Sequence, residues 1–162
     1  MSTPQTQPTG EAQSTAPAVK KRILLVEDEP HMMEMLKFRL VESQYEVATA
    51  ADGYAALAQV RVFKPDLIIL DLMLPKIDGY TICRLLKCNE DYRTIPVMIL
   101  SARSNEEDIR RGIAMGADAF MKKPYDPPTL LEKIKELLAR DRNAVPPENA
   151  EPAPEQAASP PA

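Results

Sequence analysis

Three short, almost continuous apolar runs constrain the fold of this chain most strongly. They are Ile23-Leu24-Leu25-Val26, Leu67-Ile68-Ile69-Leu70 and Val97-Met98-Ile99-Leu100. Runs of this kind are typical of strands that are covered by helices on both faces. Residues 45–50 and 117–122 are more mixed, as outer strands usually are. The sequence therefore predicts a sheet with three central and two outer strands.

Helical patterns separate these strands. The expected helices cover residues 30–42, 53–62, 78–87, 104–116 and 126–138. Ser104 with Glu107 has the spacing of a capping box, and Asp126 before Pro127 is a strong start signal. The alternation predicts an α/β protein with a doubly wound, five-stranded parallel sheet. Right-handed crossovers then give a flavodoxin-like (βα)5 fold with strand order 2-1-3-4-5.

The two ends of the chain differ in composition from its middle. Residues 1–19 and 143–162 are rich in small, polar or Pro residues, and we expect both to be disordered tails around a domain at 20–142. All 20 Lys and Arg lie in the middle segment with 20 of the 24 acidic residues, so the net charge of −4 belongs to the tails. Such a neutral body attracts no nucleic acid in general, and we expect no direct nucleic-acid partner.

Cysteine use and hydropathy indicate a cytoplasmic protein. Cys83 and Cys88 fit neither a CxxC motif nor a disulfide framework, and we expect two reduced thiols. No N-terminal run resembles a signal peptide, and no stretch reaches the roughly 18 to 20 apolar residues that cross a bilayer. We therefore expect no membrane association.

Carboxylates follow two of the central strands. Glu27-Asp28-Glu29 follow the first apolar run, and Asp71 follows the second. Because neighbouring parallel strands end at the same edge of a sheet, we expect these groups to share one crevice at the switch point of the sheet. A bound cation relieves their mutual repulsion, and oxygen ligands without His or Cys favour Mg²⁺.

The other two strands of the expected site end in a hydroxyl and an amine. Ser101 and Lys123 stand there, so a carboxylate, a metal pocket, a hydroxyl and a positive charge predict a phosphoryl-transfer site. Asp71 is the expected nucleophile and forms an acyl phosphate. Singly, Asp71 fits a turn residue, Ser101 a helix cap, Lys123 a surface charge and Phe120 an edge-strand aromatic. Their joint placement at strand ends favours the chemical interpretation.

The motifs also occur in the order of a known family. Residues 25–29, 71–75 with 78–79, 99–102 and 122–125 resemble the successive motifs of response-regulator receiver domains, over roughly residues 20–142. The resemblance implies that Glu27, Asp28 and Asp71 hold Mg²⁺ and that Asp71 is the phosphoacceptor. It implies that Lys123 pairs with the phosphoryl group, so that Asp71, Lys123 and Ser101 are the catalytic set.

Other positions take their roles from the same resemblance. Ser101 and Phe120 match the switch residues, and Lys123-Pro124 matches a peptide bond that is usually cis in the family. Met73 and Arg103 occupy positions that tune loss of the phosphoryl group. Because Met cannot orient an attacking water, we expect a long-lived phosphoform.

The resemblance implies a signalling switch and no enzyme beyond its own phosphorylation and autodephosphorylation. The expected partners are a sensor histidine kinase or phosphotransfer protein, and a downstream protein bound through the face formed by residues 95–140. A homodimer that forms on phosphorylation is a further possible partner. No second domain follows Arg142 in the sequence, so we expect a single-domain regulator.

Three other classes of protein share part of this pattern. A phosphohydrolase that forms an aspartyl phosphate carries DxDx[TV] after its first strand, whereas the residue two beyond Asp71 is Met73. A nucleotide or flavin binder needs a Gly-rich loop, which the five glycines do not form. A phosphorylation-independent pseudo-receiver scaffold keeps the fold without the chemistry, and the intact set of Asp28, Asp71, Ser101 and Lys123 argues against it.

Overall fold

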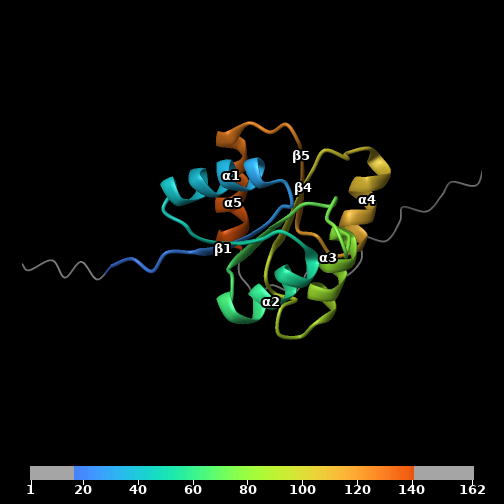
Figure 1. Cartoon of the computed structure of the whole chain (residues 1–162), viewed down its shortest axis with the longest axis horizontal. Coiled ribbons are helices and arrows are strands. Elements are labelled where there is room, and N and C mark those ends of the chain that lie inside the picture. The colour runs from blue at the N-terminus through green and yellow to red at the C-terminus, as the bar shows by residue number, and fades with distance from the viewer. Residues whose placement is uncertain (1–16, 141–162) are drawn as a thin grey trace, which may run out of the picture.

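The computed structural model describes residues 17–140 and shows a parallel sheet between two layers of helices (Figure 1). The strands are β1 (Arg22–Val26), β2 (Glu46–Ala50), β3 (Leu67–Leu70), β4 (Val97–Ser101) and β5 (Ala119–Lys122). The helices are α1 (Pro30–Glu42), α2 (Gly53–Phe63), α3 (Gly79–Cys88), α4 (Glu106–Ala114) and α5 (Pro127–Ala139). The order β2-β1-β3-β4-β5 confirms the predicted fold. Apart from residues 17–19, the predicted tails lie outside the described residues.

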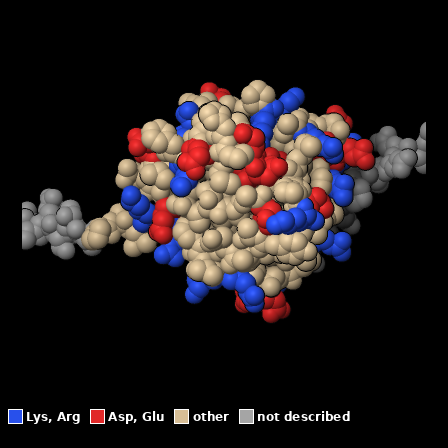
Figure 2. Space-filling view, in the orientation of Figure 1, with Lys and Arg blue, Asp and Glu red and all other residues tan. Residues whose placement is uncertain are grey.

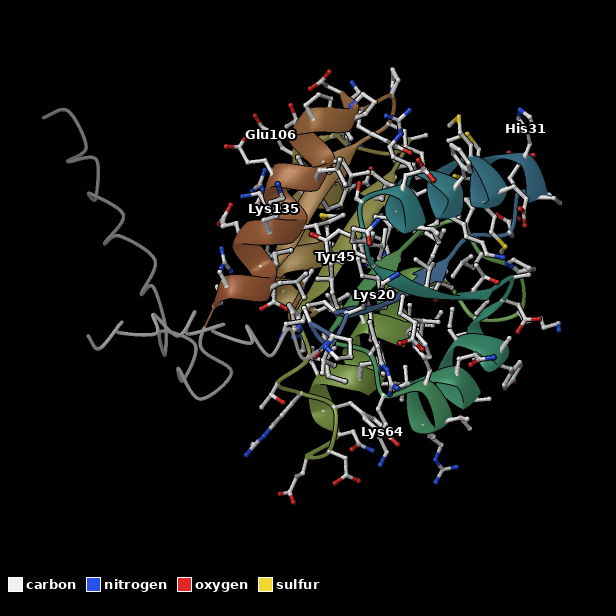
Figure 3. All side chains as sticks on the ribbon, turned by 90° about the vertical axis from the view of Figure 1, so that its left-hand side faces the viewer. Lys20, His31, Tyr45, Lys64, Glu106 and Lys135 are labelled. Carbon is white, nitrogen blue, oxygen red and sulfur yellow. The ribbon has the colours of Figure 1, made fainter. Side chains whose placement is uncertain are left out.

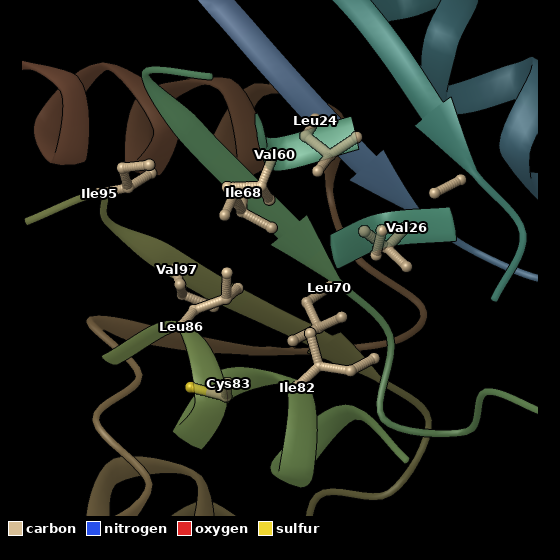
Figure 4. Packing of buried hydrophobic residues seen from close by; sticks show 12 residues of the cluster. Leu24, Val26, Val60, Ile68, Leu70, Ile82, Cys83, Leu86, Ile95 and Val97 are labelled. Atoms are coloured by element: carbon tan, nitrogen blue, oxygen red, sulfur yellow. The ribbon is translucent and has the colours of Figure 1, made fainter. Parts of the chain in front are cut away.

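Strand residues alternate between two hydrophobic layers, as the two-residue period of a strand requires. Leu24, Val26, Ile68 and Leu70 pack against α2 and α3 (Figure 4). The alternate residues of the same strands pack against α1 and α5 on the other face. Twelve of the largest side chains are less than 2% exposed, and each contributes about 1.5 to 3 kcal/mol by burial. This rigid double layer fixes where the strand ends lie.

Strands β1 and β3 end level with one another. Val26 is paired with Leu70 in the parallel register, so the next residues of both strands emerge side by side. The helices begin at this same end: in Figure 3, His31 at the start of α1 and Glu106 at the start of α4 are both in the upper part of the molecule, on opposite sides, and Lys64 after α2 is at the bottom. The positive ends of the helix dipoles are thus at the end where the carboxylates lie.

One predicted helix start is wrong. The N-cap of α4 is Asn105, whose Oδ1 accepts a hydrogen bond from Asp108 N at 2.7 Å, so Ser104 and Glu107 form no capping box. Asn and Ser are equally good N-cap residues, so the sequence alone does not decide between them. The helix begins one residue later than predicted, which makes Asn105 the N-cap. The starts at Asp78 and Asp126 are confirmed, because each side chain accepts a hydrogen bond from a backbone N–H in the first turn.

The surface and the thiols agree with the composition. Basic and acidic side chains are interspersed on the face in Figure 2. Cys83 is buried with its Sγ 3.6 Å from the carbonyl oxygen of Met115, and Cys88 is exposed, so both are free thiols as predicted. Within residues 17–140, no helix has the length and apolar character that crossing a membrane requires.

Candidate functional site

Two buried carboxylates stand at the ends of β1 and β3. Glu27 is 4% and Asp71 is 7% exposed. Their backbones continue the sheet, because Glu27 N donates to Ala50 O at 3.1 Å and Asp71 N donates to Val26 O at 3.0 Å. Asp28 follows Glu27 and is exposed. One oxygen from each of these three carboxylates lies within 4.8 Å of the others.

Glu29 has a different role from its neighbours. Its side chain caps α1 by accepting hydrogen bonds from His31 N at 3.0 Å and Met32 N at 2.7 Å. These backbone N–H groups lower the pKa of the Glu29 carboxyl. The acidic run after β1 is therefore divided, with two residues at the crevice and one at the helix start.

Lys123 joins the two buried carboxylates. Its Nζ donates to Glu27 Oε2 at 2.6 Å and to Asp71 Oδ2 at 2.8 Å, and its side chain is only 15% exposed. The backbone places it there, because Lys123 N donates to Ser101 O at 2.8 Å just beyond β5. The peptide bond from Lys123 to Pro124 is cis, as predicted. Lys123 thus forms one charged cluster with Glu27 and Asp71, although these residues lie 96 and 52 positions before it in the sequence.

Burial and charge act against one another in this cluster. Burial raises the pKa of Glu27, and the charge of Asp71 adds to this effect while Lys123 opposes it. Burial alone lowers the pKa of Lys123, but the hydrogen bonds and charges of Asp71 and Glu27 outweigh it and raise this pKa. Lys123 is therefore held as a cation, and its charge balances only one of the two carboxylates.

The remaining predicted residues surround these charges. Ser101 is fully buried at the end of β4, and its Oγ accepts a hydrogen bond from Arg103 N at 3.1 Å. Met73 N donates to Asp71 Oδ1 at 2.9 Å, while the Met73 side chain is 52% exposed. The side chain of Arg103 is also exposed. Both residues thus flank the crevice from loops that leave β3 and β4.

Phe120 lies in β5, where it is paired with Ile99 of β4. It is half-buried and packs against the buried cluster of Leu72, Tyr80 and Ile99. A Cβ on Gly112 of α4 would lie 3.0 Å from Ile99 Cδ1 and 3.2 Å from a ring carbon of Phe120. Helix α4 therefore packs closely onto this ring.

Sequence reasoning missed two contacts around the loop after Asp71. The hydroxyl of Tyr80 contacts Asp108, and Lys76 forms an ion pair with Asp52 at 2.6 Å. The partners are 28 and 24 residues apart, so no local spacing marks them. Lys76 lies in the turn before Asp78-Gly79 with a positive φ of 68°, a backbone feature that the structure shows and the sequence does not.

The donor set fits a hard divalent cation. Three carboxylates converge, two of them buried, and the side chains that meet at this point offer oxygen without His nitrogen or Cys sulfur. The charge balance agrees, since Lys123 leaves the cluster net negative. A Mg²⁺ ion thus suits these residues in both ligand type and charge.

Comparison with known proteins gives the same answer at the family level. The family model of the response regulator receiver domain matches residues 23–135. PhoP, the alkaline phosphatase synthesis transcriptional regulatory protein of Bacillus subtilis (strain 168), is 39% identical over 128 residues, which are 79% of this chain and 52% of PhoP. The chemotaxis response regulator CheY4 of Vibrio cholerae is similar in structure, with a TM-score of 0.69, 30% identity, and coverage of 73% of this chain and 98% of CheY4.

A further relative corrects one expectation. The DNA-binding dual master transcriptional regulator RpaA of Synechocystis sp. (strain ATCC 27184 / PCC 6803 / Kazusa) is 39% identical over 119 residues, which are 74% of this chain and 49% of RpaA. The chain spans about half the length of both regulators that it matches. The expectation of no direct nucleic-acid partner is therefore wrong, because it was drawn from the charge of one receiver segment while matched relatives are DNA-binding proteins.

Proposed function

Because the chain belongs to the response regulator receiver domain family, we propose that it is a phosphoryl-accepting switch of two-component signalling, with residues 20–142 as the receiver. Asp71 receives the phosphoryl group from a sensor histidine kinase or phosphotransfer protein. One observation carries the proposal: Lys123 holds the buried carboxylates of Glu27 and Asp71 together at 2.6 and 2.8 Å. A buried carboxylate that is fixed beside a cation is a ready phosphoryl acceptor.

The proposed reaction is a direct transfer to a carboxylate oxygen of Asp71. The new bond joins this oxygen to phosphorus, and the bond from phosphorus to the donor nitrogen breaks. The leaving imidazole takes up a proton. Hydrogen bonds from Met73 N to Oδ1 and from Lys123 Nζ to Oδ2 fix the orientation of the carboxylate before the reaction, which favours in-line attack.

Glu27, Asp28 and Asp71 are the residues that we propose to hold Mg²⁺. The bound ion supplies positive charge for the phosphoryl oxygens. Lys123 supplies a fixed positive charge, from an amine that is mostly buried and already hydrogen-bonded. The chain itself therefore contributes position, a nucleophile and one fixed charge.

We propose that Ser101 and Phe120 pass the change on to the face formed by residues 95–140. Ser101 Oγ can donate to a phosphoryl oxygen, and the Phe120 ring is in close contact with α4 at Gly112. An arrangement that fits the phosphoryl group better gains population in proportion to the differential interaction. The outputs that we propose are a protein target bound through this face and transcriptional control of the kind named for RpaA.

The test is the intact mass of the chain after incubation with acetyl phosphate and Mg²⁺. We expect a gain of one phosphoryl group that is lost with EDTA and in Asp71→Asn. A chain that gains nothing from acetyl phosphate and binds no Mg²⁺ is the phosphorylation-independent scaffold. A chain that binds Mg²⁺ without gaining mass is tested next with histidine kinases as donors.

A further inference from the structure

Tyr80 links the segment after Asp71 to helix α4. It is the second residue of α3 and is 7% exposed. Its hydroxyl lies 3.2 Å from both the carbonyl oxygen and Oδ1 of Asp108 and donates to them. The guanidinium of Arg111 lies over the ring, 4.3 Å from its centroid. Tyr80, Asp108 and Arg111 thus form one contact between α3 and α4, which we call the Tyr80 latch.

One side of the latch is attached to the phosphoacceptor segment. Gly79 N donates to Leu72 O at 3.0 Å, and a Cβ on Gly79 would lie 2.7 Å from Leu72 Cα. Leu72 and Tyr80 also pack together in one buried cluster. Because there is no free space between these backbones, a displacement at the residue after Asp71 is passed to Tyr80.

The other side of the latch is attached to the segment that follows Ser101. Residues 102–105 join Ser101 to α4, and Asn105 caps the helix by accepting from Asp108 N at 2.7 Å. Ser101 Oγ already accepts from Arg103 N within this connection. A shift of Ser101 toward a phosphoryl group on Asp71 therefore pulls, through residues 102–105, on the first turn of α4, which carries Asp108.

We propose that the Tyr80 latch opposes the switch, by holding the start of α4 in the arrangement seen here against the pull of the phosphorylated site. Tyr80 is thus a positioning residue that sets how much phosphorylation shifts the equilibrium. The inference rests on the proposed function, since it assumes phosphorylation at Asp71. Coupling is reciprocal, so loss of a contact that favours one arrangement tightens binding of any ligand that favours the other.

The test uses beryllofluoride, which mimics a phosphoryl group on a carboxylate. The full chain is titrated with beryllofluoride in Mg²⁺, and the amide resonances of α4 are followed by NMR. Tyr80→Phe keeps the ring under Arg111 and removes only the hydroxyl, and we expect the apparent Kd to fall about fivefold, the weight of one hydrogen bond. Tyr54→Phe, the same change at a residue that is 63% exposed on α2, is the matched control and is expected to leave the Kd unchanged.

A hydroxyl with a merely structural role leaves the Kd unchanged or weakens binding, and either result in Tyr80→Phe overturns the inference. Asp108→Ala removes the carboxylate acceptor and is expected to tighten binding in the same direction, which keeps the test open if Tyr80→Phe does not fold. A wild-type chain that takes up neither beryllofluoride nor a phosphoryl group refutes the proposed function as well. A wild-type response with unchanged variants refutes the latch alone.

Discussion

Replacing Lys123 by Met tests the charge balance of the site most directly. Met keeps the length of the aliphatic stem but removes the ammonium that contacts Glu27 at 2.6 Å and Asp71 at 2.8 Å. Two buried carboxylates then face each other with no cation from the chain. Removing one partner of a buried ion pair costs about 3 to 5 kcal/mol. We expect a loss near the lower end, about 3 kcal/mol at pH 7.5, because Lys123 is still 15% exposed and water can enter.

The loss is expected to depend on pH in a definite direction. Burial already raises the pKa of Glu27 above its ordinary value of 4.5, and removing the ammonium raises it further. An acid whose pKa is raised in the folded state binds more protons there than when unfolded, so stability falls as the pH rises through the window above 4.5. The variant therefore recovers part of its lost stability when the pH is lowered from 7.5 toward 5.

Urea unfolding at both pH values, with and without Mg²⁺, measures these effects. Lys122→Met is the matched control, since Lys122 is the exposed neighbour of Lys123. We expect Mg²⁺ to stabilise Lys123→Met more than the wild type, because the ion replaces the missing positive charge. A variant as stable as Lys122→Met, or one whose loss is the same at both pH values, refutes the charge balance described for this site.

Three further substitutions test other parts of the fold and site. Lys87→Met removes an amine that donates to Ile95 O at 2.8 Å and to Asp118 Oδ2 at 2.7 Å. We expect a loss of about 2 kcal/mol in urea unfolding, against little change for the more exposed Lys133→Met. Gly79→Ala pushes a Cβ into the backbone of the residue after Asp71, and we expect a loss of about 2 kcal/mol in the free energy of unfolding. We also expect a slower gain of mass from acetyl phosphate, and a rate equal to that of the wild type refutes the close approach. Met73→Asn places a group that can orient water beside Asp71. We expect the phosphorylated fraction, followed by intact mass, to decay several-fold faster than in the wild type. A wild-type phosphoform that lasts only seconds contradicts this reasoning.

The sheet and the strand ends of the site could be predicted because their signals are local. Each central strand is an uninterrupted apolar run, and the charged residue that follows it marks where the strand leaves the core. The parallel register pairs Val26 with Leu70 at the ends of β1 and β3, and this pairing brings Glu27 and Asp71 side by side.

The features that sequence reasoning missed are either contacts between residues far apart in the sequence or choices between neighbouring residues that differ little in energy. Asn105 instead of Ser104 caps α4, and the two residues have nearly equal preference for that position. Tyr80 meets Asp108 across 28 residues, and no periodicity brings such a pair to notice. A difference of about 1 kcal/mol decides each case, which is below what composition and spacing resolve.

Helix α4 is held at both ends, but by contacts of unequal strength. At the far end from the crevice, Asp118 follows the helix and is fixed by Lys87 at 2.7 Å and by Val97 N at 2.8 Å. This charged contact, in which the side chains of Lys87 and Asp118 are 15% and 31% exposed, is the more costly one to break. At the crevice end, the hold is the neutral hydroxyl of Tyr80 at 3.2 Å. A phosphoryl group pulls on the β4–α4 connection, so the weaker contact at the N-terminal end of α4 breaks first. We therefore expect α4 to pivot about its C-terminal end and not to slide as a whole.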